Sequence, residues 1–411
     1  MSLPPSLGVT LKKFQGMSHT AQRVAPSSGS SFGSAASISF PLPRSGVIDL
    51  QSLAVLATIN ITSAATTSIK TLPLHSGMFR RVSFQMGSAN VISLQQLSDY
   101  GFAHLLTRVY QTPKPRTDYL QTIGKEGNVT LTTATDANIV LASDFLGFLS
   151  GKHCRYLPMD VLPDCYITID LKDSQSWAIC TGGTTTITAA SLTNVRLLFN
   201  RIDWEGNLYS QLWADRLLKA PIQIPFDDVR YLEGPTTASA GSATYTGFVN
   251  SQSVDYLLAT YRPSGYGSGL TADVYKANNG GDSSTLNQLF WNGVPLSSFA
   301  MNVEDSLWAT AAALDGAGNM IYSPDFTLDG AVTATGNEFR DNFFALIYRM
   351  KLSTEAMDGP GWCTGVNTYG NSVPVDLVVS AGTSTSRKPV ILAYCTGICE
   401  VSAGKQVVPI N

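Results

Sequence analysis

Runs in which apolar and polar residues alternate predict short β-strands through most of the chain. The clearest run sets five apolar residues at every second position, on one face of a sheet: Leu53, Val55, Ala57, Ile59 and Ile61. Shorter runs of the same kind follow at 82–86, 129–131, 167–171, 195–202, 222–226, 343–352, 374–380 and 389–395. They are rich in Thr and Val and are bounded by Gly, Pro, Asn and Ser, which is typical of an antiparallel sandwich.

Apolar residues at helical spacing predict four short helices, at 94–110, 207–221, 251–263 and 303–316. The third is predicted from Val254, Leu257, Leu258 and Tyr261, which would form one stripe. Between the strands, segments rich in Gly, Ser and Asn predict long surface loops at 234–247, 264–287 and 315–337.

The order of these elements predicts two similar halves. In the first half, RRVSFQMGSANVISL leads into the helix at 94–110, and in the second, LNQLFWNGVPLSSF leads into the helix at 303–316. Both read as a strand, a small polar turn, an apolar residue and a helix. The chain has 411 residues, which is more than one hydrophobic core usually serves, so two domains are expected.

The N-terminal residues 1–36 differ from the rest, because they are rich in Ser, Gly and Pro and show little periodicity. They are expected to be an arm that orders only against a partner. No acidic residue precedes Asp49, and the arm carries Lys12, Lys13 and Arg23. These three cations are the candidate contact with a genome or an anionic membrane; the alternative is a solvated tail.

Composition narrows the function classes. Charged residues make up 14% of the chain, against roughly 25% in an average soluble domain. Such a chain is either an ordinary β-rich protein or a subunit that covers its flanks with copies of itself, because interface cores are depleted of charge. The net charge of −3 excludes a whole-chain polyanion binder. Neither a signal peptide nor a transmembrane helix is expected.

The six cysteines are sparse and show no disulfide or metal spacing, so reduced thiols are expected. Cys395 and Cys399 leave open a disulfide across a tight turn. The four histidines are scattered, and the adjacent His153 and Cys154 point apart on a strand. No catalytic, metal or cofactor-binding residue is therefore predicted.

Three acidic pairs leave a hydrolase with two carboxylates as an alternative, but each pair has a structural interpretation. Glu304 and Asp305 suit the first turn of a helix, and Asp227 and Asp228 suit a turn after the strand at 222–226. The third pair is Asp160 and Asp164. No enzyme activity is expected.

Three passages carry a resemblance to a known family. They are LPLHSGMFRRVSFQMGSANV (72–91), FNRIDWEGNLYSQLWADRLLKAPIQIPF (199–226), and GVNTYGNSVPVDLVVSAG (365–382) followed by KPVILAYC. Together with the element order, they resemble the double jelly-roll major capsid proteins of the lineage of tectiviruses, adenoviruses and large DNA viruses of eukaryotes. The resemblance covers residues 37–411.

The resemblance implies an all-β fold with a few short helices, built as two tandem eight-stranded antiparallel jelly rolls. The expected division is an arm at 1–36, a first jelly roll at 37–206, a connecting helix at 207–219 and a second jelly roll at 220–411. Loops 264–287 and 315–337 would face outward and the arm inward.

The family further implies a capsid subunit in the virion, assembled inside the host cell. It would form homotrimers of near-hexagonal outline that tile an icosahedral shell beside minor capsid or penton proteins, without a cofactor. The alternative function is a glycan-binding β-sandwich protein, such as a receptor-binding fibre or lectin.

Overall fold

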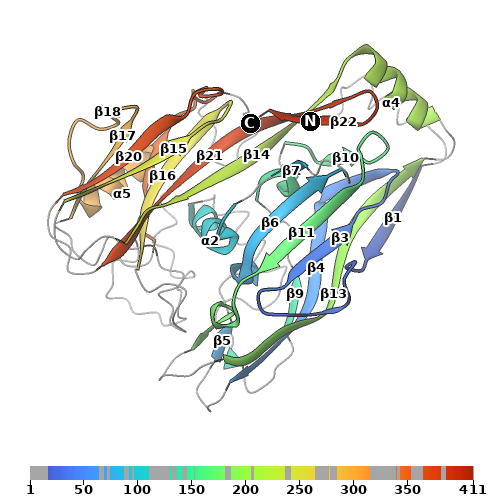
Figure 1. The fold of residues 1–411 in the computed structure, drawn as a ribbon, viewed down its shortest axis with the longest axis horizontal. Helices are drawn as coiled ribbons and strands as arrows, with labels where there is room; N and C mark the ends of the chain where they lie inside the picture. Colours follow the sequence, from blue (N-terminus) through green and yellow to red (C-terminus); the bar gives the residue numbers. More distant parts are fainter. Residues whose placement is uncertain are drawn as a thin grey trace.

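The computed structural model describes most of the chain as β-sheet (Figure 1). The described residues are 17–63, 69–71, 75–87, 92–94, 97–110, 130–131, 137–140, 146–151, 153–180, 187–204, 208–236, 242–263, 277, 285–314, 339, 343–352, 364–380 and 386–410.

The first half of the chain folds as two sheets that face each other. The outer sheet of the first roll has the order β1 (Met17–Val24), β13 (Ile187–Trp204), β4 (Val47–Ser63), β10 (Tyr156–Pro158), with β2 (Ser31–Gly33) and β9 (Ala137–Val140) added on β13 and β4. The inner sheet of the first roll is β3 (Ser37–Pro41), β11 (Cys165–Leu171), β6 (Phe79–Met86), β7 (Ile92–Leu94). A small third sheet joins β12 (Ala178–Cys180), β5 (Ile69–Thr71) and β8 (Thr130–Leu131).

The second half repeats this plan. The inner sheet of the second roll is β14 (Ile222–Glu233), β21 (Arg387–Ser402), β16 (Val254–Pro263), β19 (Leu346–Arg349), with β22 (Gln406–Ile410) added on β21. The outer sheet of the second roll is β15 (Ala243–Val249), β20 (Val373–Ser380), β17 (Leu286–Trp291), β18 (Val294–Pro295).

Both halves have the same strand order. If the eight main strands of each half are numbered in chain order, one sheet reads 1-8-3-6 and the other 2-7-4-5 in both halves. Two facing antiparallel sheets connected in this way form a jelly roll. The fold class predicted from the sequence, a double jelly roll, is therefore confirmed.

In Figure 1 the first roll lies at the lower right and the second roll at the upper left. Alternation puts one face of each strand into a core. The five apolar residues predicted on one face of β4 are all buried, with exposures of 0–3%.

Three α-helices lie in the described part of the chain: α2 (Tyr100–Tyr110), α4 (Leu208–Lys219) and α5 (Val303–Ala313). Short 3₁₀ turns are η1 (His75–Met78), η2 (Gly147–Ser150) and η3 (Ser174–Ser176). As predicted from the two similar passages, α2 follows the β6–β7 hairpin and α5 follows the β17–β18 hairpin. The second hairpin turns at Asn292 and Gly293, both with positive φ, as a two-residue turn requires.

The predicted helix at 251–263 is wrong, because Val254–Pro263 forms strand β16. Residues 254–262 are all buried, since this strand lies in the middle of a sheet with the second core on one side and the first roll on the other. A strand buried on both faces has a continuous apolar run instead of alternation. That run happens to satisfy the helical spacing as well.

Two other predictions need correction. Residues 17–24 and 31–33 of the predicted arm pair with β13, so this part of the chain belongs to the outer sheet of the first roll. Residues 1–16 lie outside the described residues. The predicted loop 234–247 contains the start of β15, while most of the predicted loops 264–287 and 315–337 lies outside the described residues.

Candidate functional site

Four cysteines are free and buried or partly buried: Cys154, Cys165, Cys395 and Cys399. Burial raises the pKa of the Cys154 thiol to about 11 and that of the Cys395 thiol to about 12. A thiol with a raised pKa is a poor nucleophile. His153 and Cys154 are therefore no activated pair, and because Cys395 and Cys399 are both free, the alternative of a disulfide between them is wrong.

The acidic pairs hold the structure together. Glu304 and Asp305 lie in the first turn of α5, as predicted, and Asp305 forms a reciprocal capping box with Asn302. Asp227 and Asp228 do not form a turn, because β14 continues through them to Glu233. Asp160 accepts a hydrogen bond from the backbone of Gly46 (3.0 Å), and Asp164 pairs with Arg44 (2.8 Å).

Within the described residues, no group of three or more His, Cys, Asp or Glu side chains could hold a metal ion. Of the helices that the structure describes, none has the length and apolar character needed to cross a bilayer.

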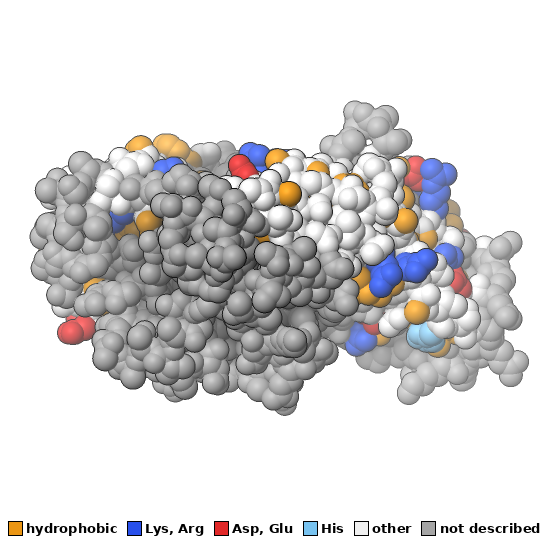
Figure 2. Space-filling view, turned by 90° about the horizontal axis from the view of Figure 1, so that it is seen from below, with side chains coloured by type: hydrophobic (Ala, Val, Ile, Leu, Met, Phe, Trp, Pro, Cys, Tyr) orange, Lys and Arg blue, Asp and Glu red, His pale blue; other side chains and the backbone are white. Residues whose placement is uncertain are grey.

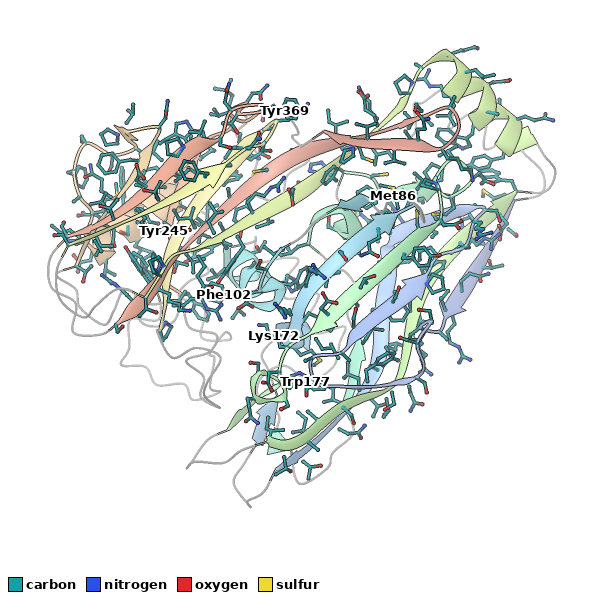
Figure 3. All side chains as sticks on the ribbon, in the orientation of Figure 1. Met86, Phe102, Lys172, Trp177, Tyr245 and Tyr369 are labelled. Carbon is teal, nitrogen blue, oxygen red and sulfur yellow. The ribbon has the colours of Figure 1, made fainter. Side chains whose placement is uncertain are left out.

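The most strongly built polar site lies at the junction of the two rolls. Asp99 precedes α2 in the first roll, and it is bound on two sides by cations. Lys172 at the end of β11 lies 2.6 Å from Asp99 Oδ1, and Arg262 of β16 in the second roll donates to Asp99 Oδ2. The Arg262 guanidinium also lies over the ring of Phe102, at 4.2 Å, and its side chain is fully buried. Figure 3 shows Phe102 and Lys172 in the region between the rolls.

This cluster fixes the charge of Asp99. Burial alone would raise the pKa of its carboxyl group, but the charges of Arg262 and Lys172, with their hydrogen bonds, hold that pKa well below the usual 3.8. Burial lowers the pKa of Lys172, and the Asp99 charge opposes that shift. A buried charge that loses its partner is costly, so the cluster selects one position of the rolls relative to each other.

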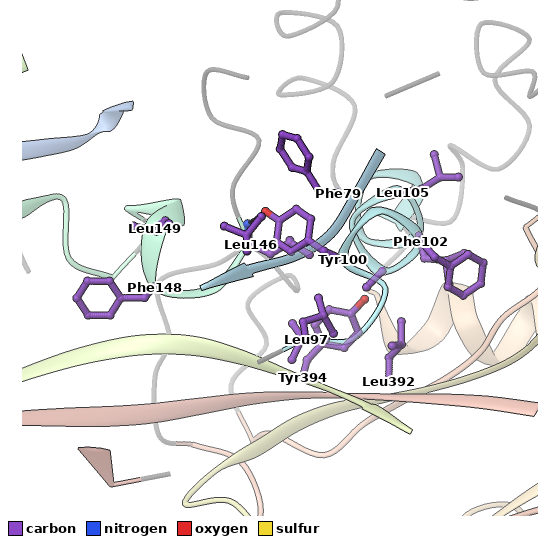
Figure 4. Close-up of a cluster of buried hydrophobic side chains, with 14 of the residues drawn as sticks. Phe79, Leu97, Tyr100, Phe102, Leu105, Leu146, Phe148, Leu149, Leu392 and Tyr394 are labelled. Atoms are coloured by element: carbon purple, nitrogen blue, oxygen red, sulfur yellow. Dashed lines mark hydrogen bonds between the residues drawn. The ribbon is translucent and has the colours of Figure 1, made fainter. Parts of the chain in front are cut away.

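Apolar packing surrounds this cluster. Figure 4 shows α2 above Leu392 and Tyr394 of β21, with Tyr100 and Phe102 on the helix. Thr107 of α2 lies 2.8 Å from the Tyr394 hydroxyl, a hydrogen bond between the rolls. The apolar residues Phe102, Leu105 and Leu106 of this helix are all buried.

The second roll also covers the end of the first. Phe148 of η2 stacks on Phe84 of β6 (centroids 4.6 Å apart) and contacts Phe226 of β14 (5.9 Å). His153 Nε2 lies 2.6 Å from Asp227 Oδ1, again across the two rolls. The buried apolar side chains of the two rolls therefore form one continuous cluster across the junction.

Several large apolar residues of the second half of the chain are exposed. On the outer sheet of the second roll, the Phe248 side chain is 62% exposed. Three further large apolar residues are exposed, namely Val294 (64%), Phe299 (48%) and Trp308 (67%).

Of the three cations predicted to contact a polyanion, Arg23 lies within the described residues. Arg23 lies exposed on β1, where it pairs with Leu198 of β13. Lys12 and Lys13 lie outside the described residues. Strand β1 begins at Met17, which pairs with Trp204, four positions before the start of α4. Figure 2 shows Lys and Arg side chains gathered at the first-roll end of the face that it displays.

Solved structures of similar fold come from viruses. The VP54 structure of PBCV-1, fitted into a reconstruction of the virophage Sputnik, matches with a TM-score of 0.64 and 12% identity, over 97% of this chain and 98% of that one. The Faustovirus major capsid protein matches with a TM-score of 0.56 and 11% identity, over 95% and 91%. A Sputnik virophage structure matches with 0.55 and 13%, over 96% and 88%. No family model and no curated protein matches the sequence. At these identities the likeness establishes the double jelly-roll fold.

The sequence did not predict the charged cluster at the junction of the rolls. Asp99, Lys172 and Arg262 are far apart in the chain, and no spacing rule connects them. One signal was available: Arg262 ends the apolar run VDYLLATYRP, and a charge in a buried strand needs a partner.

Proposed function

We propose that this chain is the major capsid protein of an icosahedral virus, resident in the virion and assembled inside the host cell. The observation that carries the proposal is the pair of jelly rolls with identical strand order. The structural neighbours named as capsid structures share this fold over nearly their whole length. Expression of the full chain followed by negative-stain microscopy tests the proposal, with shells or flat hexagonal arrays as the expected product.

The proposed building block is a homotrimer. Two similar rolls per chain give six per trimer, so a closed ring of three chains has a near-hexagonal outline. Such a tile packs into the facets of a shell but does not fit a fivefold vertex, so separate penton or minor capsid proteins complete the proposed particle. Light scattering of the purified chain is expected to give three chain masses.

The N-terminal segment is proposed to contact a polyanion on the inner side of the shell, through Lys12, Lys13 and Arg23. A few cations bind weakly alone, but a shell repeats them many times. Removal of residues 2–16 is expected to leave trimers intact and to reduce particle yield. Binding of assembled particles to anionic vesicles, compared with binding to duplex DNA, distinguishes a membrane from a genome. Equal yield and equal binding after the deletion would contradict this role.

The proposed role requires no catalytic activity of the chain itself. The raised thiol pKa values and the structural engagement of the acidic pairs support it. The alternative, a glycan-binding sandwich, predicts glycan-array signals from a protein that does not form arrays. That combination would contradict the capsid proposal.

A further inference from the structure

Three free thiols from both rolls gather where the end of the second roll's inner sheet meets the first roll. Cys154 lies between η2 and β10, and Cys165 begins β11, so both belong to the first roll. Cys399 belongs to the second roll, on β21, where the strand register holds it between Ile224 of β14 and Pro409 of β22. These cysteines come from distant parts of the chain, and the fold brings them into one region.

The contact of His153 with the second roll brings Cys154 to β21. The imidazole Nε2 of His153 lies 2.6 Å from Asp227 Oδ1 on β14. Asp227 stands opposite Thr396 of β21, three positions before Cys399. The segment that carries Cys154 therefore lies against the β14–β21 pair, a short way along the strand from Cys399.

Cys165 approaches the same strand from the inner sheet of the first roll. It stands opposite Met86 at the end of β6, and Met86 pairs in turn with β7. Strand β7 contacts β22, which is the neighbour of β21 at Cys399. Figure 3 shows Met86 on the side of the first roll that faces β21 and β22. Both rolls thus supply sulfur atoms to one buried region.

These thiols affect one another's pKa and differ in accessibility. Burial raises the pKa of Cys399 to about 12, and the nearby Cys154 thiol is the next cause of that shift. Burial also raises the pKa of Cys165 to about 12, followed by the effects of Asp164 and of Cys399. Cys154 is partly buried, whereas Cys399 is fully buried, so a reagent in solution reaches Cys154 first.

We propose that Cys154 and Cys399 are a redox-sensitive pair, which forms a disulfide between the two rolls when the chain meets a low-molecular-weight disulfide such as oxidised glutathione. Cys399 is fixed inside a sheet, but Cys154 lies outside regular secondary structure. Its backbone can therefore adjust to the geometry that an S–S bond requires. Cys165 is held by its ladder to β6 and is not the partner.

The reaction proceeds by two thiol–disulfide exchanges. The Cys154 thiolate attacks one sulfur of the oxidant, the S–S bond of the oxidant breaks, and one half leaves and is protonated to a thiol. The Cys399 thiolate then attacks the Cys154 sulfur of this mixed disulfide, and the second half leaves in the same way. The two cysteines lose two electrons and two protons, and the oxidant is reduced to two thiols.

The disulfide would tie the second roll to the first covalently. Because Cys154 and Cys399 are far apart in the chain, such a link restrains the unfolded chain strongly and stabilises the folded one. The formation of the bond does not depend on the proposed function, but its timing rests on it. The reducing interior of a cell keeps thiols free during assembly, and the surroundings outside the cell are oxidising. The bond would therefore close after release of the particle.

The test oxidises the reduced full-length chain with oxidised glutathione, blocks the remaining thiols by alkylation and identifies linked peptides by mass spectrometry. The expected result is a peptide that joins Cys154 to Cys399, with two fewer alkylated thiols per chain. Cys154→Ser and Cys399→Ser are each expected to abolish the link, and Cys165→Ser is the matched control that keeps it. Cys154→Ala and Cys399→Ala replace the serine variants if these lower stability.

Two further measurements distinguish a native pair from adventitious oxidation. The urea midpoint of unfolding is expected to rise on oxidation and to return with dithiothreitol, in the wild type and in Cys165→Ser. The rate of link formation is expected to rise about tenfold per pH unit from about pH 7 to 9, because the thiolate is the nucleophile and both thiols are protonated there.

The results that overturn the inference are a link from Cys165 to Cys399, a stable glutathione adduct on Cys154 without a link, or a full set of alkylated thiols after oxidation. Shells that assemble while all thiols stay free overturn this inference alone. A chain that forms the link but assembles into no shell overturns the proposed function and leaves the disulfide pair standing.

Discussion

Asp99 and Arg262, 163 residues apart in the chain, form an ion pair that joins the first jelly roll to the second. Arg262 is fully buried, and Lys172 binds the other oxygen of the same carboxylate. Two cations share one anion in a packed interface, so the position of one roll on the other is specified by charge as well as by shape.

Replacement of Asp99 by Asn is expected to destabilise the protein strongly, because it leaves two buried cations without their counter-charge. The free energy of unfolding should fall by about 3–5 kcal/mol, measured by chemical denaturation. Asp170→Asn is the matched control, since Asp170 pairs with an Arg81 side chain that is 45% exposed. That change is expected to cost less than about 1 kcal/mol. Equal losses in the two variants would contradict the role of the cluster.

Acidic pH is expected to lower the stability of the contact between the rolls, because it protonates Asp99. The pKa of Asp99 is held well below its usual 3.8, so the unfolded chain takes up this proton at a higher pH than the folded chain does. Its contribution to stability is fully present above about pH 4 and is lost as the pH falls further. Burial raises the pKa of Asp228 and of Asp255, and these groups act in the opposite sense.

Comparison of the wild-type chain with Asp99→Asn isolates this effect, because both proteins keep Asp228 and Asp255. The difference in unfolding free energy is expected to be constant from about pH 7 to 5 and to shrink below about pH 4. A difference that grows on acidification would show the opposite sign and refute the assignment.

Substitution of Phe226 tests how strongly the second roll packs against the first. It is buried and contacts Phe148 across the junction. Phe226→Ala is expected to cost about 3–5 kcal/mol, as for other large core truncations. Phe248→Ala, at an exposed position, is expected to change the stability of the monomer by less than about 0.5 kcal/mol. Thermal unfolding of the two variants side by side provides the measurement.

Substitution of Trp213 tests how strongly the packing of α4 on the rest of the protein contributes to stability. The residue is partly buried and meets the Tyr209 ring edge-on, with centroids 6.0 Å apart. Trp213→Ala is expected to lower the unfolding free energy by about 1–2 kcal/mol, below the value for a fully buried aromatic residue. A loss above about 4 kcal/mol would mean that the helix is an integral part of the core. Leu218→Ala is the control, with little expected effect.

Alternation was sufficient to predict antiparallel β-sandwich structure, because it is visible wherever one face of a strand meets solvent, and the family resemblance added the prediction of a double roll. The β4 residues from Leu53 to Ile61 and the two hairpin-helix passages are examples. It failed at β16, where burial on both faces removes the alternation that identifies a strand. It also placed all of residues 1–36 in an arm, because the polar strand β1 lies at a sheet edge and buries little.

The candidate surfaces were harder to predict than the fold. Phe248 stands in the sequence ATYTGFV, where an exposed and a buried aromatic residue look alike. Only the buried neighbour Val249 shows which face Phe248 occupies. The junction cluster depends on tertiary contacts between distant segments, which a single sequence does not reveal.

Mass and shape of the purified full-length chain in solution test the central claim most directly. Light scattering combined with negative-stain imaging is predicted to show three chain masses in a particle of six-lobed, near-hexagonal outline. A stable monomer with two lobes at all accessible concentrations would contradict the proposal that this double jelly roll is the tile of a viral shell.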